Sequence, residues 1–221
     1  MEGEAMIPYE GKEFSAEEMK QRSQTFLAFM QQRRSLREFS DRPVSKDVIR
    51  DIIMAASTAP SGAHKQPWTF CAISNVELKG EIREAAEKEE YLNYHGRMSD
   101  TWLEDLEPMG TDWNKAFLEI APWLIAVFKR PFEMVDGTQR KNYYVNESVG
   151  LACGILLTAV HNAGLVALTH TPSPMNFLEK ILQRPSNERA FLLIPVGYPA
   201  EHALVPNLQR KAEGEVLVFH T

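Results

Sequence analysis

The sequence has little cysteine, no long apolar run and no excess of positive charge. Its two cysteines, Cys71 and Cys153, lie between apolar neighbours, so we expect buried thiols and no disulfide framework. The longest apolar stretch covers residues 149–160, whereas a helix that spans a bilayer needs about 20 apolar residues. With 24 basic against 30 acidic side chains, the chain lacks the basic surface expected of a nucleic-acid-binding protein.

Several motifs for nucleotides and metals are also missing. No GxGxxG, P-loop, GxSxG or HExxH pattern occurs, and the six histidines are scattered along the chain. We therefore expect no metal ion and no Rossmann-type dinucleotide site. The first residues are acidic and polar, unlike a signal or transit peptide, so we expect a cytoplasmic protein without a membrane partner.

Apolar periodicity predicts helices that alternate with strands. Ser15 and Glu18 form a capping box that opens a first helix, and Ser45 is placed to cap a second helix. A charged, mostly solvated helix is predicted at 76–98, and an apolar helix at 143–163. The remaining expectations are buried strands at 68–74, 122–129, 165–171 and 190–199, short helices around Pro108 and Gly110, a loop at 130–142, and a last strand at 215–220.

This alternation predicts one α/β (α+β) domain over residues 1–221, with a central mixed sheet of four to five strands flanked by helices. The helix at 143–163 is apolar on nearly every side, so it belongs inside the protein or at a subunit interface. Gly150 and Gly154 lie one turn apart on this helix and are expected to permit close helix packing.

An arginine cluster stands out in this acidic chain. The segment QQRRSLREFS, residues 31–40, gathers Arg33, Arg34 and Arg37 around Ser35. Guanidinium groups and a serine hydroxyl can chelate a phosphate through paired, charge-assisted hydrogen bonds. An ordinary basic helix end, whose cations interact favourably with the helix dipole, explains the same residues equally well.

Two further segments carry groups suited to a flat ligand. Pro60, Ser61, Gly62 and Ala63, within TAPSGAHKQPW, are expected to form a tight turn with free backbone N–H groups. The segment THTP contains Thr169, His170 and Thr171 at the end of a predicted strand, where ligands often lie in layered α/β folds. A plain connecting loop and ordinary strand threonines are the alternative interpretations.

Together, RRSLREF and the downstream APSGAHKQPW resemble the nitroreductase-like flavoproteins, which bind flavin mononucleotide (FMN) at the interface of an intertwined homodimer. The segments EEYLNYHGRM, TDWNKAFLEIAP, ACGILLTAVHNAGL and LLIPVGYPAE are similar to the members of that family that dehalogenate halotyrosines. The resemblance covers residues 30 to 211, approximately.

The resemblance implies a set of FMN-binding residues in several segments. These are Arg33, Arg34, Ser35, Arg37, Pro60, Ser61, Gly62, Thr169, His170, Thr171 and Arg210. The arginines and Ser35 would hold the phosphate and ribityl chain, the Ser61 loop would hold the isoalloxazine ring, and Thr171 would hydrogen-bond flavin N5. The family has TTTP where this chain has THTP, so the backbone of His170 would serve in place of a threonine side chain.

The resemblance also implies a substrate site, formed by Ala63, Glu90, Tyr94, Thr111 and Lys115. A zwitterionic amino acid needs an anion for its ammonium and a cation for its carboxylate, and Glu90 and Tyr94 share a helix face at i,i+4. A solvated charged face is the alternative for these residues. Residues 76–116 would form a charged helical lid that orders over the substrate, and residues 200–221 would pack on the partner subunit.

The activity implied is reductive dehalogenation of 3-iodo-L-tyrosine, diiodotyrosine and related halotyrosines to tyrosine and halide, by stepwise electron transfer from reduced flavin. Thr171 and the backbone N–H of Ala63 would be the catalytic groups, and a reductase or NAD(P)H would supply electrons. Two other functions stay open: an NAD(P)H-dependent nitro or quinone reductase of the same fold, and a flavin-binding module without catalysis.

Overall fold

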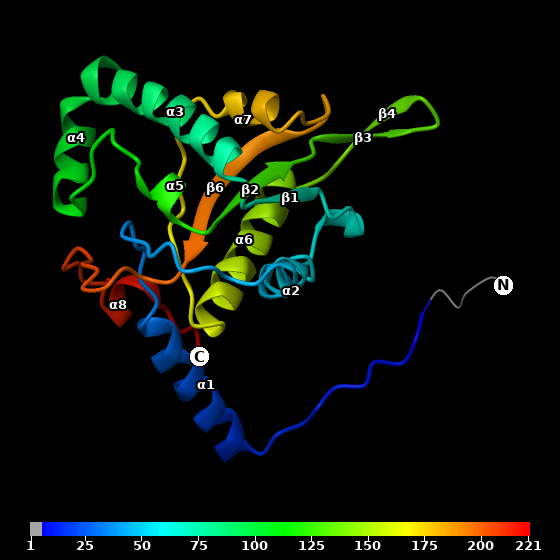
Figure 1. The fold of residues 1–221 in the computed structure, drawn as a ribbon. Helices are drawn as coiled ribbons and strands as arrows, with labels where there is room; N and C mark the ends of the chain where they lie inside the picture. The colour runs from blue at the N-terminus through cyan, green and yellow to red at the C-terminus, as the bar shows by residue number, and fades with distance from the viewer. Residues whose placement is uncertain (1–5) are drawn as a thin grey trace. The chain divides into compact units, whose positions relative to one another are not determined.

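The computed structural model describes residues 6–221, which form two compact units that divide after Arg33 (Figure 1). The first unit contains helix α1 (Ala16–Gln31). The Ser15 hydroxyl accepts the backbone N–H of Glu18, and the Glu18 carboxylate accepts the backbone N–H of Ser15, which confirms the predicted capping box.

The second unit is built on a four-stranded sheet in the order β1-β2-β6-β5. Its strands are β1 (Trp68–Ile73), β2 (Trp123–Lys129), β5 (Val166–Ala167) and β6 (Arg189–Gly197). Neighbouring strands are antiparallel, and the mixed character of the sheet comes from an isolated parallel bridge between Ser35 and Ala167. The buried strands predicted at 122–129 and 190–199 are confirmed, because β2 and β6 occupy the centre of the sheet.

The two edges of the sheet differ from the prediction. The prediction of a fully buried strand at 68–74 is wrong, because β1 pairs only with β2 and its middle residues are partly accessible. The strand predicted at 165–171 is reduced to β5 and a single antiparallel bridge between His170 and Leu193. Burial at an edge depends on the order of strands, which the local apolar pattern does not contain.

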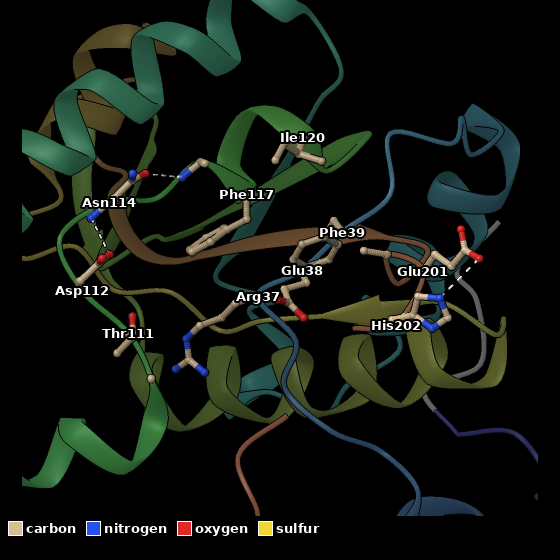
Figure 2. Close-up of a pocket in the computed structure, with 13 residues that line it drawn as sticks. Arg37, Glu38, Phe39, Thr111, Asp112, Asn114, Phe117, Ile120, Glu201 and His202 are labelled. Carbon is tan, nitrogen blue, oxygen red and sulfur yellow. Dashed lines mark hydrogen bonds and ion pairs between the residues drawn. The ribbon is translucent and has the colours of Figure 1, made fainter. Parts of the chain in front are cut away.

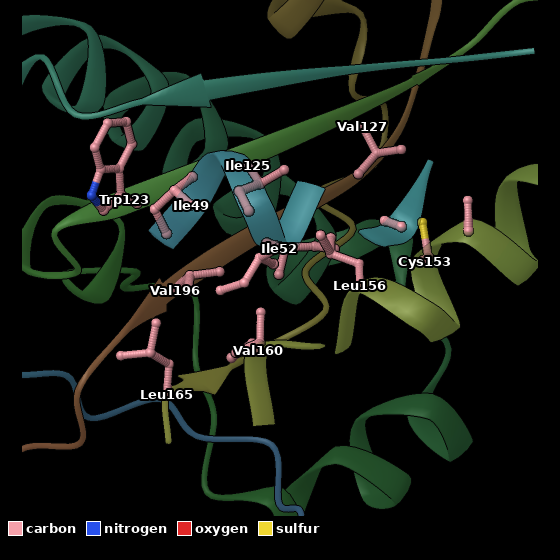
Figure 3. Packing of buried hydrophobic residues seen from close by; sticks show 14 of the residues in the cluster. Ile49, Ile52, Trp123, Ile125, Val127, Cys153, Leu156, Val160, Leu165 and Val196 are labelled. Carbon is pink, nitrogen blue, oxygen red and sulfur yellow. The ribbon is translucent and has the colours of Figure 1, made fainter. Parts of the chain in front are cut away.

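Helices cover both faces of the sheet, and the side chains of β2 alternate between the two cores (Figure 1). Ile125 and Val127 face α2 (Lys46–Ala56) and α6 (Val145–Asn162), and Figure 3 shows the core on this side. The opposite face carries Leu124, Ala126 and Phe128 of β2 and packs against α3 (Val76–Leu92), α5 (Phe117–Ile120) and α7 (Asn176–Ile181).

Helix α3 is solvated on its outer face but buries one stripe, formed by Lys79, Ile82, Ala86 and Glu90. The prediction of a mostly solvated helix is therefore wrong for this stripe, which includes two charged residues. The chain continues through a π-helical turn η2 (Asn93–Arg97), helix α4 (Asp100–Leu106) and a 3₁₀ turn η3 (Glu107–Met109). Gly110 ends this region with a left-handed φ of 58°. The short helices predicted around Pro108 and Gly110 are confirmed.

Residues 130–142 form a β-hairpin, so the prediction of a loop is wrong. Strand β3 (Phe132–Val135) pairs with β4 (Thr138–Lys141). Asp136 and Gly137 lie between them with φ of 51° and 74°, as a tight two-residue hairpin turn requires. The Asp-Gly dipeptide is a hairpin signal that the loop interpretation did not use.

The prediction of a strand at 215–220 is also wrong. Residues there begin in a short helix α8 (Glu213–Val216), and Val218 and Phe219 are exposed. A strand needs a neighbour that pairs with its backbone. A Cβ added to Gly150 or Gly154 would meet no atom of the described residues within 4 Å outside its own helix turn, so packing within the chain does not explain these glycines.

No helix within residues 6–221 is both long and apolar enough to cross a membrane. Over the same residues, no group of three or more His, Cys, Asp and Glu side chains is placed to hold a metal ion.

Candidate active site

A cavity of about 190 Å³ lies between the end of α3, the helices that follow it, and the THTP segment. Many of the predicted site residues line it: Arg37, Glu90, Tyr94, Thr111, Lys115, Thr169, His170 and Thr171. Its wall also contains apolar residues that the sequence interpretation missed, namely Met98, Trp102, Leu106, Phe117 and Leu168. The apolar residues between 98 and 106 could have predicted this wall, because a fully solvated lid would not need apolar side chains there.

Glu90 and Lys115 face each other inside this cavity. The Nζ atom of Lys115 lies 3.4 Å from Oε2 of Glu90, and the two side chains are only 4% and 8% exposed, respectively. Lys115 Nζ also donates to the Thr111 hydroxyl at 3.2 Å and to the carbonyl of Asp112. The Tyr94 hydroxyl donates to the carbonyl of Thr111 at 3.2 Å, and Lys115 Nζ lies 5.5 Å from the centre of the Tyr94 ring. A carboxylate, an ammonium and a phenol therefore converge on the wall of one small cavity.

Burial perturbs the ionisation of these groups. It raises the pKa of the Glu90 carboxyl and lowers the pKa of the Lys115 ammonium, while each partner opposes the shift of the other. Burial also raises the pKa of Tyr94, so its hydroxyl stays protonated and can donate. The close approach of Nζ and Oε2 favours the charged pair, and a ligand with both charges can satisfy each partner.

Arg37 is half-buried where three cavities meet. A larger cavity of about 470 Å³ shares Arg37, Thr111 and Phe117 with the first, and Figure 2 shows these residues on its wall. A third, of about 270 Å³, is lined by Arg37 together with Ser35 and Pro206. Burial lowers the pKa of Arg37, although a guanidinium keeps its charge. Across residues 6–221 Arg37 forms no ion pair, so its charge is open to an anionic or polar ligand.

The other arginines of the predicted cofactor site have different surroundings. Arg34 donates to the carbonyl of Pro206, a residue that lines the third cavity together with Ser35 and Arg37. Arg33 belongs to the first unit, where its backbone N–H bonds the carbonyl of Met30. Arg210 is exposed in the C-terminal segment and is not among the lining residues of these three cavities.

His170 lies behind the two threonines. The side chains of Thr169 and Thr171 are exposed, while His170 between them is buried, as alternation in an extended segment requires. The His170 ring meets the Phe117 ring edge-on at 5.7 Å, and its Nε2 atom has no hydrogen-bond partner in the part of the chain that is described. Burial, with the nearby charges of Lys115 and Arg37, lowers the pKa of His170 to about 3.

The residues of the Pro60–Ala63 turn line none of these three cavities. Ser61 Oγ accepts the backbone N–H of Gln66 at 2.9 Å, and Ala63 is exposed with a φ of 50°. Gly62 is needed for the chain's own packing, because a Cβ there would lie 2.9 Å from the carbonyl oxygen of Tyr143.

Sheet order explains this separation. The turn precedes β1 at one edge of the sheet, whereas Ala167 and the THTP segment lie at the other edge, with β2 and β6 between them. Neighbouring strands are about 4.8 Å apart, so the two edges are about 14 Å apart before any offset along the strands. Trp68 pairs with Lys129 and Lys129 with Arg189, so the turn also lies toward the start of β6. One chain therefore carries two incomplete halves of the predicted site.

A match to a known family defines the class of this protein. The model of the nitroreductase family matches residues 30–198. The chain therefore belongs to the nitroreductase family.

Within this family the chain is similar to iodotyrosine deiodinases. It is 64% identical over 217 residues to iodotyrosine deiodinase of Haliscomenobacter hydrossis, and the match covers 98% of each chain. It is 46% identical over 217 residues to iodotyrosine deiodinase of Danio rerio, covering 96% of this chain and 73% of that protein.

Solved structures agree with the sequence comparison. The crystal structure of oxidised iodotyrosine deiodinase bound to FMN and 3-iodo-L-tyrosine superposes with a TM-score of 0.75 and 28% identity, over 88% of this chain and 98% of that one. A nitroreductase with bound FMN from Bacteroides fragilis has a TM-score of 0.66 at 21% identity, over 88% of this chain and 98% of that one, and shares the fold.

Proposed function

We propose that this protein is an FMN-dependent reductive dehalogenase of iodotyrosine and related halotyrosines. The observation that carries the proposal is the buried pair of Glu90 and Lys115 beside Tyr94, in a cavity whose wall also holds Arg37 and Thr171. A zwitterionic amino acid needs both charges of this pair. The high identity to iodotyrosine deiodinases over nearly the whole chain supports the substrate.

The residues around the cavity fit FMN. Arg37 presents a half-buried cation that forms no ion pair across residues 6–221, and Thr169 and Thr171 present exposed hydroxyls beside it. Together with Arg33, Arg34, Ser35 and Arg210, these groups would bind the phosphate, the ribityl chain and the N5 edge of the flavin ring. Charge-assisted hydrogen bonds of this kind are the strong ones in phosphate recognition.

Bound FMN would supply the electrons of the reaction, in which two electrons and one proton convert a carbon–iodine bond into a carbon–hydrogen bond and iodide. The chain's own residues bind and orient the substrate. Glu90 would hold the substrate ammonium and Lys115 its carboxylate, with hydrogen bonds from Tyr94 and Thr111. Reactants held in a fixed orientation react faster because the entropy of association is lost on binding and not in the chemical step.

The phenol end of the substrate explains the preference for halogenated tyrosine. An ortho halogen lowers the phenol pKa, so more of the ligand is phenolate near neutral pH. The backbone N–H of Ala63 would donate to this phenolate, and hydrogen bonds to an anion are stronger than hydrogen bonds to a neutral group. Tyrosine itself stays protonated and would bind weakly.

Residues 76–116 would act as a lid over the bound substrate. Met98, Trp102 and Leu106 line the cavity from this segment, and apolar side chains there would exclude water once the lid is closed. We expect the part of the lid beyond Glu90 to become ordered when the zwitterion bridges Glu90 and Lys115, because the earlier part of α3 is already anchored in the core by Ile82 and Ala86.

A homodimer would complete the site. A second copy can bring its Pro60–Ala63 turn to the cavity that the first copy leaves open, and two-fold symmetry would complete both sites at once. The exposed Leu151 on α6 and the exposed Phe219 in the 200–221 extension are apolar surfaces available for this contact. Electrons would reach the flavin from NAD(P)H or a reductase. The two free thiols suit a reducing, cytoplasmic location.

The test is a titration of the purified, oxidised flavoprotein with 3-iodo-L-tyrosine and with L-tyrosine, followed by flavin fluorescence. Strong quenching by iodotyrosine and little by tyrosine is the expected result. Equal, weak responses would favour a nitro or quinone reductase instead. Iodide release from the reduced protein under anaerobic conditions excludes a binding module without catalysis, and a protein purified without flavin would contradict the cofactor.

A further inference from the structure

Glu87 and Arg83 form a polar network on α3 just before Glu90. We call Glu90 and Lys115 the substrate clamp, because they would hold the ammonium and the carboxylate of the substrate. The Oε1 atom of Glu87 accepts the backbone N–H of Lys115 at 2.7 Å and the Nε–H of Arg83 at 2.7 Å. Arg83 also donates to Oε2 of Glu119 at 2.7 Å and to Oδ1 of Asn114 at 3.4 Å. One guanidinium therefore joins α3 to the chain on both sides of Lys115.

Lys115 is consequently fixed to α3 at two points. Its main chain bonds Glu87, and its ammonium group pairs with Glu90, which lies one helical turn further along. Residues three apart on a helix lie on the same side, so the helix itself sets the spacing between the two contacts. The direction of the Lys115 side chain follows from this spacing.

The segment that carries Lys115 needs such support. It runs from Gly110, with its left-handed φ of 58°, to the start of α5 without regular secondary structure. Besides the bonds that Tyr94 and Arg83 donate to it, this segment has short-range hydrogen bonds. Examples are the bonds from the backbone of Asn114 to Asp112 and from the backbone of Ala116 to Asn114. A lysine side chain loses much rotamer freedom when it is fixed, so a segment that is ordered in advance binds its ligand more tightly.

We propose that Glu87, held in place by Arg83, is a positioning residue for the substrate clamp. It sets the backbone of Lys115 so that the ammonium group faces Glu90 before the substrate arrives. This inference rests on the proposed function, because it assigns Lys115 to the substrate carboxylate. Glu87 itself does not contact the substrate.

The experiment compares two ligands on the FMN-loaded protein. 3-Iodo-L-tyrosine carries the ammonium and the carboxylate, whereas 2-iodophenol lacks both and reports only on the phenol side of the site. Dissociation constants are measured by flavin fluorescence for Glu87→Ala and Glu87→Gln. The control is Glu179→Ala, which likewise removes an acceptor of a backbone N–H, that of Ala190 at 3.2 Å, and an ion pair of 3.7 Å with Arg189, outside the lid and the cavity wall.

For Glu87→Ala we expect the dissociation constant of iodotyrosine to rise about tenfold, the effect of one lost charge-assisted hydrogen bond, with that of 2-iodophenol changing less than about twofold. Glu87→Gln keeps an acceptor for the Lys115 N–H and should recover most of the iodotyrosine affinity. Glu179→Ala should leave the dissociation constants of both ligands unchanged. Equal weakening of both ligands by Glu87→Ala, or no weakening of either, would overturn the inference.

Hydrogen exchange at the Lys115 amide gives a readout that needs no substrate. Glu87→Ala should speed this exchange at least tenfold, while Glu179→Ala should not, and an unchanged rate in Glu87→Ala would overturn the positioning role. If the wild-type protein fails to bind iodotyrosine, the proposed function is wrong, whereas the exchange rate still decides whether Glu87 fixes the backbone of Lys115.

Discussion

The Nζ atom of Lys115 lies 3.4 Å from Oε2 of Glu90, with both side chains more than nine-tenths buried. The two residues come from different parts of the chain, the end of α3 and the irregular segment before α5. A buried ion pair costs the hydration of both charges and is therefore weak support for stability. Its position on a cavity wall fits recognition of a zwitterionic ligand better than a structural role.

Glu90→Gln tests the ammonium half of this pair. The change keeps the shape of the side chain and removes its charge, so iodotyrosine should bind about ten- to a hundredfold more weakly, as expected for a lost hydrogen bond between charged groups. Flavin content should not change. The measurement is the fluorescence titration with flavin content recorded by absorbance, and unchanged affinity would contradict the clamp.

Arg37→Ala tests the cofactor side. Removal of a half-buried cation from the cavity wall should lower the affinity for FMN about tenfold or more, because charge-assisted contacts to the flavin are lost. The matched control is Arg42→Ala, since Arg42 is exposed and stacks 3.9 Å from the centre of the Tyr198 ring. Ultrafiltration with FMN gives both dissociation constants, and equal values for the two variants would exclude Arg37 from the FMN site.

We expect His170 to make the free energy of unfolding depend on pH. Its pKa is lowered from 6.5 to about 3, because the buried ring disfavours a charge near Lys115 and Arg37. Below pH 6.5 the unfolded chain binds a proton that the folded protein does not, so the contribution of this group falls as pH falls. The loss from pH 7 to pH 4 is about 3 kcal/mol.

His170→Asn removes this titration and should flatten the pH dependence of urea unfolding between pH 7 and pH 4. Glu90, whose raised pKa also changes its proton binding near the acid end, is present in both proteins and cancels in the comparison. Parallel stability curves for the wild type and the variant would mean that His170 does not stay neutral in the folded protein.

Leu151→Glu tests the proposed subunit contact. Leu151 is exposed on α6, near two glycines whose side-chain positions are open in the single chain. A charge there should give a monomer in light scattering and, because the site is then incomplete, a protein that loses FMN. Met134→Glu on the hairpin, at another exposed apolar residue, is the control and should remain a dimer. If Leu151→Glu remains a dimer with full FMN content, the subunit interface does not include Leu151.

Local sequence patterns were sufficient for the elements whose cause is local. The capping box at Ser15 and the cap at Ser45 are formed by residues a few positions apart, and both are present. The apolar runs at 122–129 and 190–199 predicted strands, and both strands are present as β2 and β6. The hairpin at residues 130–142 was also within reach, because its Asp-Gly turn is a local signal.

Other features depend on which segments meet. β1 is half-accessible because it occupies an edge of the sheet, and the C-terminal residues form no strand because no neighbour in the described chain pairs with them. Strand order is a long-range property, and a six-residue apolar pattern is the same at the centre and at the edge.

By itself the sequence determined the residue types of the candidate site: an arginine cluster, a turn with a glycine, two threonines, and a carboxylate with a phenol on one helix face. Only the tertiary structure decided which of them share a cavity. It pairs Glu90 with Lys115, it places Arg37 and Thr171 on the wall of the same cavity, and it leaves the Pro60–Ala63 turn near the opposite edge of the sheet. The physical reason is that contacts within a helix follow from residue spacing, whereas contacts between elements follow from how the sheet is ordered and how its two faces are covered.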